Sequence, residues 1–217
     1  MEKYSELAGL IKTWGIQEGF QQVGITNTSL EKHEKHLSSW LQNGYAADMN
    51  YMSKHGKKRT QPEMLWPGTI RIISARMDYL NEGIQVNNIL NSKSKAYIAQ
   101  YAMGRDYHKV VRSRLKKLSQ RINEYITTQG NEGFTARVFS DSAPILEKGI
   151  AEKAGLGWIG KNTLVLNKNA GSWFFLGEIY TNIPLPVDKP IPINRCGSCQ
   201  ACIDTVSYTH LTLPTKA

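Results

Sequence analysis

The sequence contains no long apolar run and no apolar leader. Across its 217 residues, no stretch approaches the about 18–20 consecutive apolar residues that a membrane-spanning helix needs. Residues 1–6 are mostly polar, whereas a secretion signal has an apolar centre. We therefore expect a cytoplasmic protein that neither spans a membrane nor is secreted.

Cysteine is scarce and confined to one segment. Cys196, Cys199 and Cys202 are the only three in the chain, and they lie within one stretch of seven residues. Cysteines this close together cannot connect distant parts of a fold, so a disulfide framework is excluded. This usage agrees with the reducing cytosol.

Acidic residues are outnumbered by basic ones. The chain has 18 Asp and Glu against 27 Lys and Arg, a formal charge of +9. Apolar residues make up 41% and charged residues 21%, which is typical of a globular domain and argues against disorder. The positive excess predicts an anionic partner, with nucleic acid the first candidate and a phosphorylated cofactor the second.

The pattern of apolar residues predicts a mixed fold without internal repeats. A Thr28–Glu31 capping box predicts one helix that Gly44 ends, and helical spacing marks three more, at residues 3–19, 105–128 and 146–154. The segment 81–94 has the composition of a loop, and strand patterns mark residues 20–26, 70–79, 96–101, 136–139, 163–166 and 172–182. Helices and strands do not alternate strictly, which favours an α+β or layered α/β fold over a doubly wound sheet.

The helix predicted over residues 105–128 is strongly basic. Its outer face opposes one acid, Asp106, with seven basic residues: Arg105, Lys109, Arg112, Arg114, Lys116, Lys117 and Arg121. Together with the basic loop at residues 54–59, this face is either a surface for a polyanion or an ordinary solvated face. Tyr107 and His108, near the start of the helix, could stack on bases or pack against the protein.

The cysteine run has the spacing of an iron–sulfur motif. C-x2-C-x2-C places three thiolates on one tight loop, as in the bacterial iron–sulfur sequence, which continues with a fourth cysteine after three residues. Val206 stands at that position here. Cys196, Cys199 and Cys202 are therefore three candidate ligands of a cluster whose fourth ligand would come from further along a longer chain. A structural zinc site is the alternative, although zinc sites usually use two separated pairs of ligands.

An acidic residue follows one of the predicted strands. Asp141 lies between the strand at residues 136–139 and the rigid turn at Ala143 and Pro144. A carboxyl at the end of a strand can project into a cleft and act as a general acid. The alternative is a helix cap, in which Asp141 or Ser142 starts the next helix. The glycine-rich segment 154–162 permits close approach of a ligand but matches no nucleotide-binding fingerprint.

A series of segments, taken in order, resembles the epoxyqueuosine reductase family. The segments are residues 20–26, 59–62, 67–69, 104–108, 141–145, 151–157, 160–162, 171–172 and 182–186, followed by the cysteine run. The resemblance covers about residues 1–205. It implies a cobalamin-binding catalytic domain of nitroreductase-like type over residues 1–185, and the start of a ferredoxin-like 4Fe–4S domain over residues 186–205.

The resemblance also implies an activity and a site. The family reduces the epoxide of epoxyqueuosine in tRNA to queuosine, the last step of queuosine biosynthesis, with cobalamin and with electrons that 4Fe–4S clusters take from an external donor. Asp141 would protonate the departing oxygen, and Cys196, Cys199 and Cys202 would be cluster ligands. The residues implied to line the cobalamin are Arg59, Ala99, Asp141, Lys161, Val165 and Leu176.

Two other functions stay open, and the end of the chain departs from the family pattern. A corrinoid iron–sulfur reductase similar to a reductive dehalogenase would act on a small molecule and would not need the basic helix. A corrinoid-binding or electron-transfer module would not need an acid in the cofactor cleft. Residues 206–217 lack the second cysteine run of the family. We expect them to be a non-native tail that leaves the first cluster one ligand short.

Overall fold

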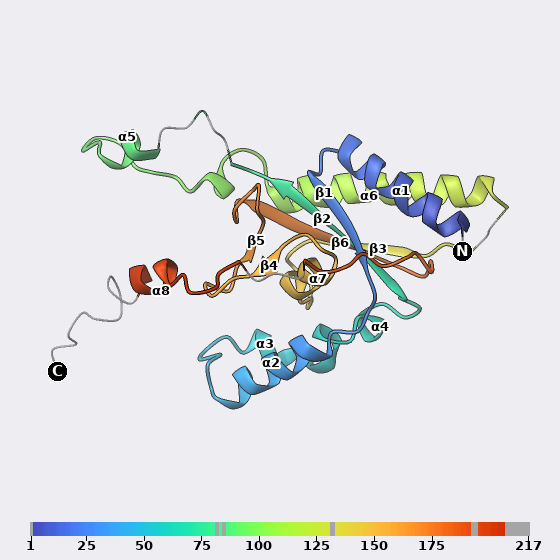
Figure 1. Ribbon diagram of the computed structural model, residues 1–217, viewed down its shortest axis with the longest axis horizontal. Helices are drawn as coiled ribbons and strands as arrows, with labels where there is room; N and C mark the ends of the chain where they lie inside the picture. Colours follow the sequence, from blue (N-terminus) through green and yellow to red (C-terminus); the bar gives the residue numbers. More distant parts are fainter. Residues whose placement is uncertain (1, 81–82, 84–85, 131–132, 192–194, 207–217) are drawn as a thin grey trace.

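The protein has a mixed α/β fold around one antiparallel sheet. The computed structural model describes residues 2–80, 83, 86–130, 133–191 and 195–206, so residues 207–217 of the expected tail lie outside it. The four strands run in the order β1–β2–β6–β3 (Figure 1). They span Gln22–Thr26 (β1), Arg71–Asp78 (β2), Phe174–Thr181 (β6) and Ala136–Phe139 (β3).

Of the two long central strands, β6 is rich in the β-branched and aromatic residues that suit a pleated surface, and β2 contributes Ile72 and Ile73. They pair over eight residues each, from Arg71 opposite Thr181 to Asp78 opposite Phe174. Successive residues of a strand face opposite sides of the sheet. Ile179 therefore packs into one core and Tyr180 into the other.

Two long helices, α1 (Glu2–Gln17) and α6 (Tyr107–Thr128), lie against one face of the sheet (Figure 1). The apolar stripe of α6 is fully buried there, at Val111, Leu115, Leu118, Ile122 and Ile126. Close approach of α6 to β6 depends on Gly177, because a Cβ at this position would lie 2.6 Å from Cγ1 of Val111. The glycine thus fixes the distance between the helix and the sheet.

The helix α7 (Glu147–Lys153) packs on the other face, where its buried Ile150 joins Ile72 and Tyr180. Its end meets β1 so closely that a Cβ on Gly24 would lie 2.0 Å from the carbonyl oxygen of Ala154. The shorter helices α2 (Glu31–Gln42), α3 (Tyr51–Lys54) and α4 (Pro62–Leu65) and the 3₁₀ turn η1 (Gly56–Arg59) lie together below the sheet in Figure 1.

Smaller elements complete the described part of the chain. They are a hairpin of β4 (Trp158–Ile159) and β5 (Val165–Leu166), the helices α5 (Val86–Leu90) and α8 (Ala201–Val206), and the 3₁₀ turn η2 (Gln100–Ala102). Within the described ranges, no helix combines the length and apolar character that crossing a bilayer demands.

Three local predictions were wrong. Residues 96–101 form no strand; the buried Gln100 instead starts η2. The Thr28–Glu31 capping box does not form, because Leu30 occupies the N-cap position of α2 without a side-chain hydrogen bond and its side chain is buried in the core. The predicted loop at residues 81–94 contains α5. The other predicted strands and long helices are present with shifted ends.

Candidate active site

Asp141 lies on the turn between β3 and α7, with its side chain at the surface. Its backbone is in the left-handed region, with φ of 59°. Among non-glycine residues, Asp and Asn tolerate this conformation best, at a cost of about 1–3 kcal/mol that the surroundings must offset. The contacts that hold this turn are therefore central to the site.

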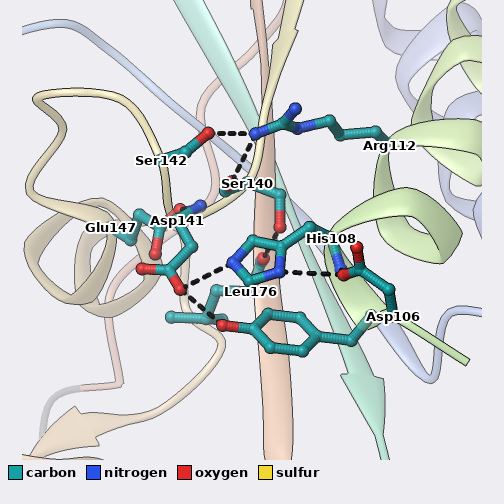
Figure 2. A network of polar contacts seen from close by, with 9 residues as sticks. Asp106, His108, Arg112, Ser140, Asp141, Ser142, Glu147 and Leu176 are labelled. Carbon is teal, nitrogen blue, oxygen red and sulfur yellow. Dashed lines mark hydrogen bonds and ion pairs between the residues drawn. The ribbon is translucent and has the colours of Figure 1, made fainter. Parts of the chain in front are cut away.

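The first turn of α6 places two side chains on the Asp141 carboxyl (Figure 2). The hydroxyl of Tyr107 donates to Oδ2 of Asp141, and Nε2 of His108 lies 3.1 Å from the same oxygen. On its other side, Nδ1 of His108 lies 3.0 Å from Oδ1 of Asp106, which also caps α6 by accepting from the His108 backbone N–H. His108 thus bridges two carboxyl groups.

The geometry around His108 restricts where its protons lie. Because Nδ1 faces the carboxylate of Asp106, it carries a hydrogen. The contact between Nε2 and Asp141 then needs one further proton, on either the ring or the carboxyl. Asp141 and His108 are therefore placed so that they can share a proton at the surface of the site, as a general acid requires.

Tyr107 is fixed by aromatic stacking. Its ring lies parallel to Phe175, with 4.0 Å between centroids and 4° between planes, and it also stacks on His108. Burial raises the pKa of the Tyr107 hydroxyl, and its hydrogen bond to Asp141 raises it further. The phenol therefore stays protonated and acts as a hydrogen-bond donor.

Arg112, one turn further along α6, clasps the backbone around Asp141. Its Nη2 donates to the hydroxyl of Ser142 and to the carbonyl oxygen of Ser140, the latter at 3.4 Å. The helix-cap alternative for Asp141 and Ser142 is wrong. Leu146 is the N-cap residue of α7, and no side chain caps that end. Both side chains are used in contacts with α6 instead.

Two further carboxyls lie beneath the turn, and neither was predicted from the sequence. Oε1 of Glu147 accepts from the backbone N–H of Asp141 at 2.5 Å. Glu178, a residue of β6 with no exposed surface, lies within reach of the Glu147 carboxyl, and its buried Oε2 has no hydrogen-bond partner among the described residues. Burial raises the pKa of Glu147 to about 7 and that of Glu178 well above its usual range. The sequence does contain one indication of a buried acid, because Glu178 is the only charged residue in its strand.

Two cavities adjoin the Tyr107–Asp141 contact. One, of about 470 Å³, is lined by Asp141, Glu147, Arg59, Trp40 and other residues of α2, α3 and α7. The other, of about 660 Å³, is lined by Tyr107, Phe175 and a set of polar and apolar residues that includes Tyr79, Gln100, Tyr101 and Met103. Since Tyr107 lines one cavity and Asp141 the other, the hydrogen bond between them joins the walls of the two cavities.

Of the other residues expected to line a cofactor, Arg59 is the one that shares a cavity with Asp141. Its Nη2 donates to the carbonyl oxygen of Tyr51 at 3.0 Å, and its buried Nε has no hydrogen-bond partner among the described residues. Ala99 is exposed and directly precedes Gln100 at the larger cavity. The carbonyl oxygen of Leu176 accepts from the Ser140 hydroxyl at 3.3 Å.

Lys161 and Val165 are placed differently from these residues. Val165 is only 4% exposed and packs in a small core with Leu156 and Phe174, so little of this residue is open to a ligand. Lys161 donates from Nζ to the carbonyl oxygens of Gly197 and Cys199, both at 2.9 Å. Its side chain therefore ties the cysteine segment to the loop after β4.

None of the three described cysteines is part of a disulfide. Cys199 is exposed and Cys196 and Cys202 are partly buried. The backbone N–H of Lys161 lowers the pKa of Cys196 by hydrogen bonding to it. Nowhere in the described part of the chain are three His, Cys, Asp or Glu residues grouped so that they could hold a metal ion. As placed, the cysteines do not fit a metal centre.

Comparison with known proteins shows which family this chain resembles. A sequence model described as epoxyqueuosine reductase QueG, DUF1730 matches residues 59–142. The chain is 54% identical over 200 residues to an epoxyqueuosine reductase of Pseudomonas aeruginosa, covering 92% of this chain and 54% of that protein. The chain therefore spans about half the length of the curated relatives it matches.

Solved structures agree with this fold. A structure of epoxyqueuosine reductase from Streptococcus thermophilus matches 91% of this chain and 51% of its own, with a TM-score of 0.77 and 27% identity. Another epoxyqueuosine reductase, solved with an epoxyqueuosine-modified tRNA stem loop, matches 93% of this chain and 52% of its own, with a TM-score of 0.76. At 23% identity, this second likeness concerns the fold alone.

Proposed function

Because the chain belongs to the epoxyqueuosine reductase family, we propose that it carries the catalytic part of an enzyme that reduces the epoxide of epoxyqueuosine in tRNA to queuosine. One observation supports this most directly. Asp141, which lines one cavity, meets His108 and also Tyr107, which lines the other, so a proton can be delivered to a ligand bound beside Asp141.

The residues of this site suit the protonation that the reaction needs. An oxyanion is a poor leaving group from carbon, so the epoxide oxygen must receive a proton as its bond to carbon breaks. Asp141 is exposed enough to reach a ligand, with a side chain 55% accessible. His108 shares the proton with Asp141, and the Tyr107 hydroxyl stabilises the carboxylate that forms when the proton leaves.

Two features of the cavities support a large cofactor such as cobalamin. The buried Nε of Arg59 is a donor without a partner in the described protein and could serve an amide oxygen of the corrin. Exposed Tyr101 and Met103 offer apolar surface at the larger cavity. We propose that Arg59, Ala99, Lys161, Val165 and Leu176 surround the cofactor, the last three mainly through their backbone. When bound, cobalamin would supply the electrons for the reduction.

The proposed role of the cysteine segment rests on less evidence than that of Asp141. We propose Cys196, Cys199 and Cys202 as 4Fe–4S ligands on their spacing alone, within a domain that begins at residue 186 and follows a catalytic domain of residues 1–185. The three side chains as placed do not form a metal centre. The lowered pKa of Cys196 is consistent with a ligand role, because a thiolate is the ligating form.

A tRNA partner agrees with the charge of α6, but fewer residues are available than the sequence predicts. Arg112 is used on the Asp141 turn, Arg114 donates to the carbonyl oxygen of Gly19 at 2.7 Å, and Arg121 contacts Glu18 at 3.3 Å. Lys116 and Lys117 are exposed. We propose that these two lysines contact tRNA phosphates, and that an external donor supplies the electrons in the cytoplasm.

A chimera tests the proposed activity. Residues 1–205 replace the matching half of the Pseudomonas aeruginosa relative, and the purified protein is reconstituted with cobalamin and iron and sulfide under anaerobic conditions. It is then given epoxyqueuosine-bearing tRNA and a chemical reductant. Formation of queuosine in the tRNA supports the proposal. A chimera that binds cobalamin and tRNA yet forms no queuosine would contradict it, and would favour a small-molecule reductase or a binding module.

A further inference from the structure

The carboxyls of Glu147 and Glu178 form a buried pair directly beneath Asp141. Glu178 sits on the central strand β6 with no exposed surface, and the Ser74 hydroxyl of β2 donates to its Oε1 at 3.4 Å. Glu147 is the first residue of α7. Its carboxyl contacts Glu178 and also accepts from the backbone N–H of Asp141. Glu147 therefore joins the turn that carries the acid to the middle of the sheet.

This pair requires a proton. Two carboxylates cannot donate a hydrogen bond to each other, and two like charges in contact inside a protein cannot both stay ionised near neutral pH. The other titratable groups facing the pair are Asp141 itself, His108 from α6 and Tyr180 on β6. Arg76, which follows Ser74 by two positions on β2, is basic, but it pairs with Asp78 at 3.3 Å and not with either glutamate. Since no salt bridge to either carboxyl is found among the described residues, a shared proton balances the pair.

We propose that the proton shared by Glu147 and Glu178 positions Asp141 for catalysis. While it is present, the carboxyl–carboxyl hydrogen bond holds Glu147 where its Oε1 accepts from the Asp141 N–H. When it is lost, the two carboxylates repel. Glu178 is locked in the sheet, so Glu147 moves and the strained turn loses its acceptor. The pair thus consists of positioning residues, and this inference deepens the proposed function on which it rests.

Isosteric amides separate this role from simple packing. In Glu178→Gln, the amide donates to the Glu147 carboxylate without needing a proton. In Glu147→Gln, the amide oxygen still accepts from Asp141 while its nitrogen donates to Glu178. Both variants imitate the protonated pair at every pH. Glu147→Ala removes the acceptor altogether. Glu152→Gln is the matched control, because it lies on the same helix and accepts from a backbone N–H, that of Ile159 at 3.1 Å, without touching Asp141.

The direct readout is hydrogen exchange of the Asp141 amide, followed by NMR in this chain without any cofactor. Rates are divided by the intrinsic exchange rate at each pH, between about pH 5 and about pH 9, which spans the titration of such a pair. In the parent and in Glu152→Gln, protection should fall about tenfold as the pH rises, the effect of one lost hydrogen bond. In Glu178→Gln and Glu147→Gln it should stay high. In Glu147→Ala it should be low throughout, while the amide of Ile179 stays protected.

Equal pH dependence in the parent and Glu178→Gln would overturn the inference, as would unchanged protection in Glu147→Ala. The same variants in the chimera give the catalytic readout. The parent rate of epoxide reduction should fall at alkaline pH, and Glu178→Gln should extend its plateau upward. If exchange behaves as expected but no variant forms queuosine, the positioning role stands and the proposed function fails. If queuosine forms but the exchange rate of the Asp141 amide is the same in all variants, the proposed function stands and the positioning role fails.

Discussion

The hydroxyl of Tyr107 donates to the carboxyl of Asp141 across the junction between the first turn of α6 and the turn after β3. The two residues are 34 positions apart in the chain. Because Tyr107 is also stacked on Phe175 of β6, the position of the acid is set by the packing of helix on sheet.

Asp141→Asn should fold and bind cofactor but lose at least about 10²-fold in epoxide reduction. Asn tolerates the left-handed backbone and still accepts from Tyr107, but it cannot donate a carboxylic proton. The measurement is a single turnover of the chimera with pre-reduced cobalamin, which removes electron delivery from the rate. Asp48→Asn, at an exposed loop position, is the control. An Asp141→Asn rate within a few-fold of the parent would remove Asp141 from the catalytic step.

Arg59→Gln should weaken cobalamin binding to this chain by about tenfold, the effect of one hydrogen bond to a buried group. The reason is the orphaned Nε donor at the cavity that Asp141 also lines. Absorbance titration measures the affinity. Lys57→Gln, an exposed residue of the same 3₁₀ turn, should bind as the parent does. Equal affinity of all three proteins would show that Arg59 does not contact the cofactor.

Reversing the charge of Lys116 and Lys117 should weaken tRNA binding and lower its dependence on salt. Each lost phosphate contact reduces the slope of log affinity against log salt by about one. Binding of the double Lys→Glu variant is compared with that of Lys35→Glu, an exposed lysine on α2. A slope identical to that of the parent would mean that this face of α6 is only solvated.

The stability of the chain should fall as the pH rises from about 4.5 to about 7. Burial raises the pKa of Glu147 from 4.5 to about 7, so in this window the folded state binds a proton that the unfolded chain has released. The stabilising contribution is present at the acid end and is lost as the pH passes about 7. Urea unfolding of the parent and Glu147→Gln across this range measures it. Parallel curves for the two proteins would contradict the raised pKa.

Periodic segments were the most predictable part of the structure. The apolar stripe of α6 and the alternation of β2 depend only on neighbouring residues, so the sequence is sufficient to predict both. The strand expected at residues 96–101 failed because a strand also needs an edge to pair with, and local composition does not show whether one is near. The turn at η2 forms instead, with Gln100 buried.

The candidate site was only partly predictable. Asp141 could be singled out because an acid after a strand can project into a cleft, and the family resemblance pointed to the same residue. Its contacts with Tyr107 and His108 depend on how closely α6 approaches the sheet, which periodicity does not specify. The Glu147–Glu178 pair joins a helix start to a central strand, and the lone acid in an apolar strand was its one visible sign.

The bare backbone of Gly177 has a consequence for the site as a whole. A Cβ there would come within 2.6 Å of Val111 and 2.8 Å of Leu115, on the face of β6 that α6 covers. The next residue, Glu178, points to the opposite face and reaches Asp141 through Glu147. The thickness of the sheet and its distance from α6 therefore set the position of Asp141. Tyr107 and His108 contact its carboxyl from α6 on one face, and Glu147 contacts its backbone from α7 on the other face. A methyl group at residue 177 would push α6 away from the sheet. It would thereby move Tyr107 and His108 relative to Asp141 without contacting Asp141 itself.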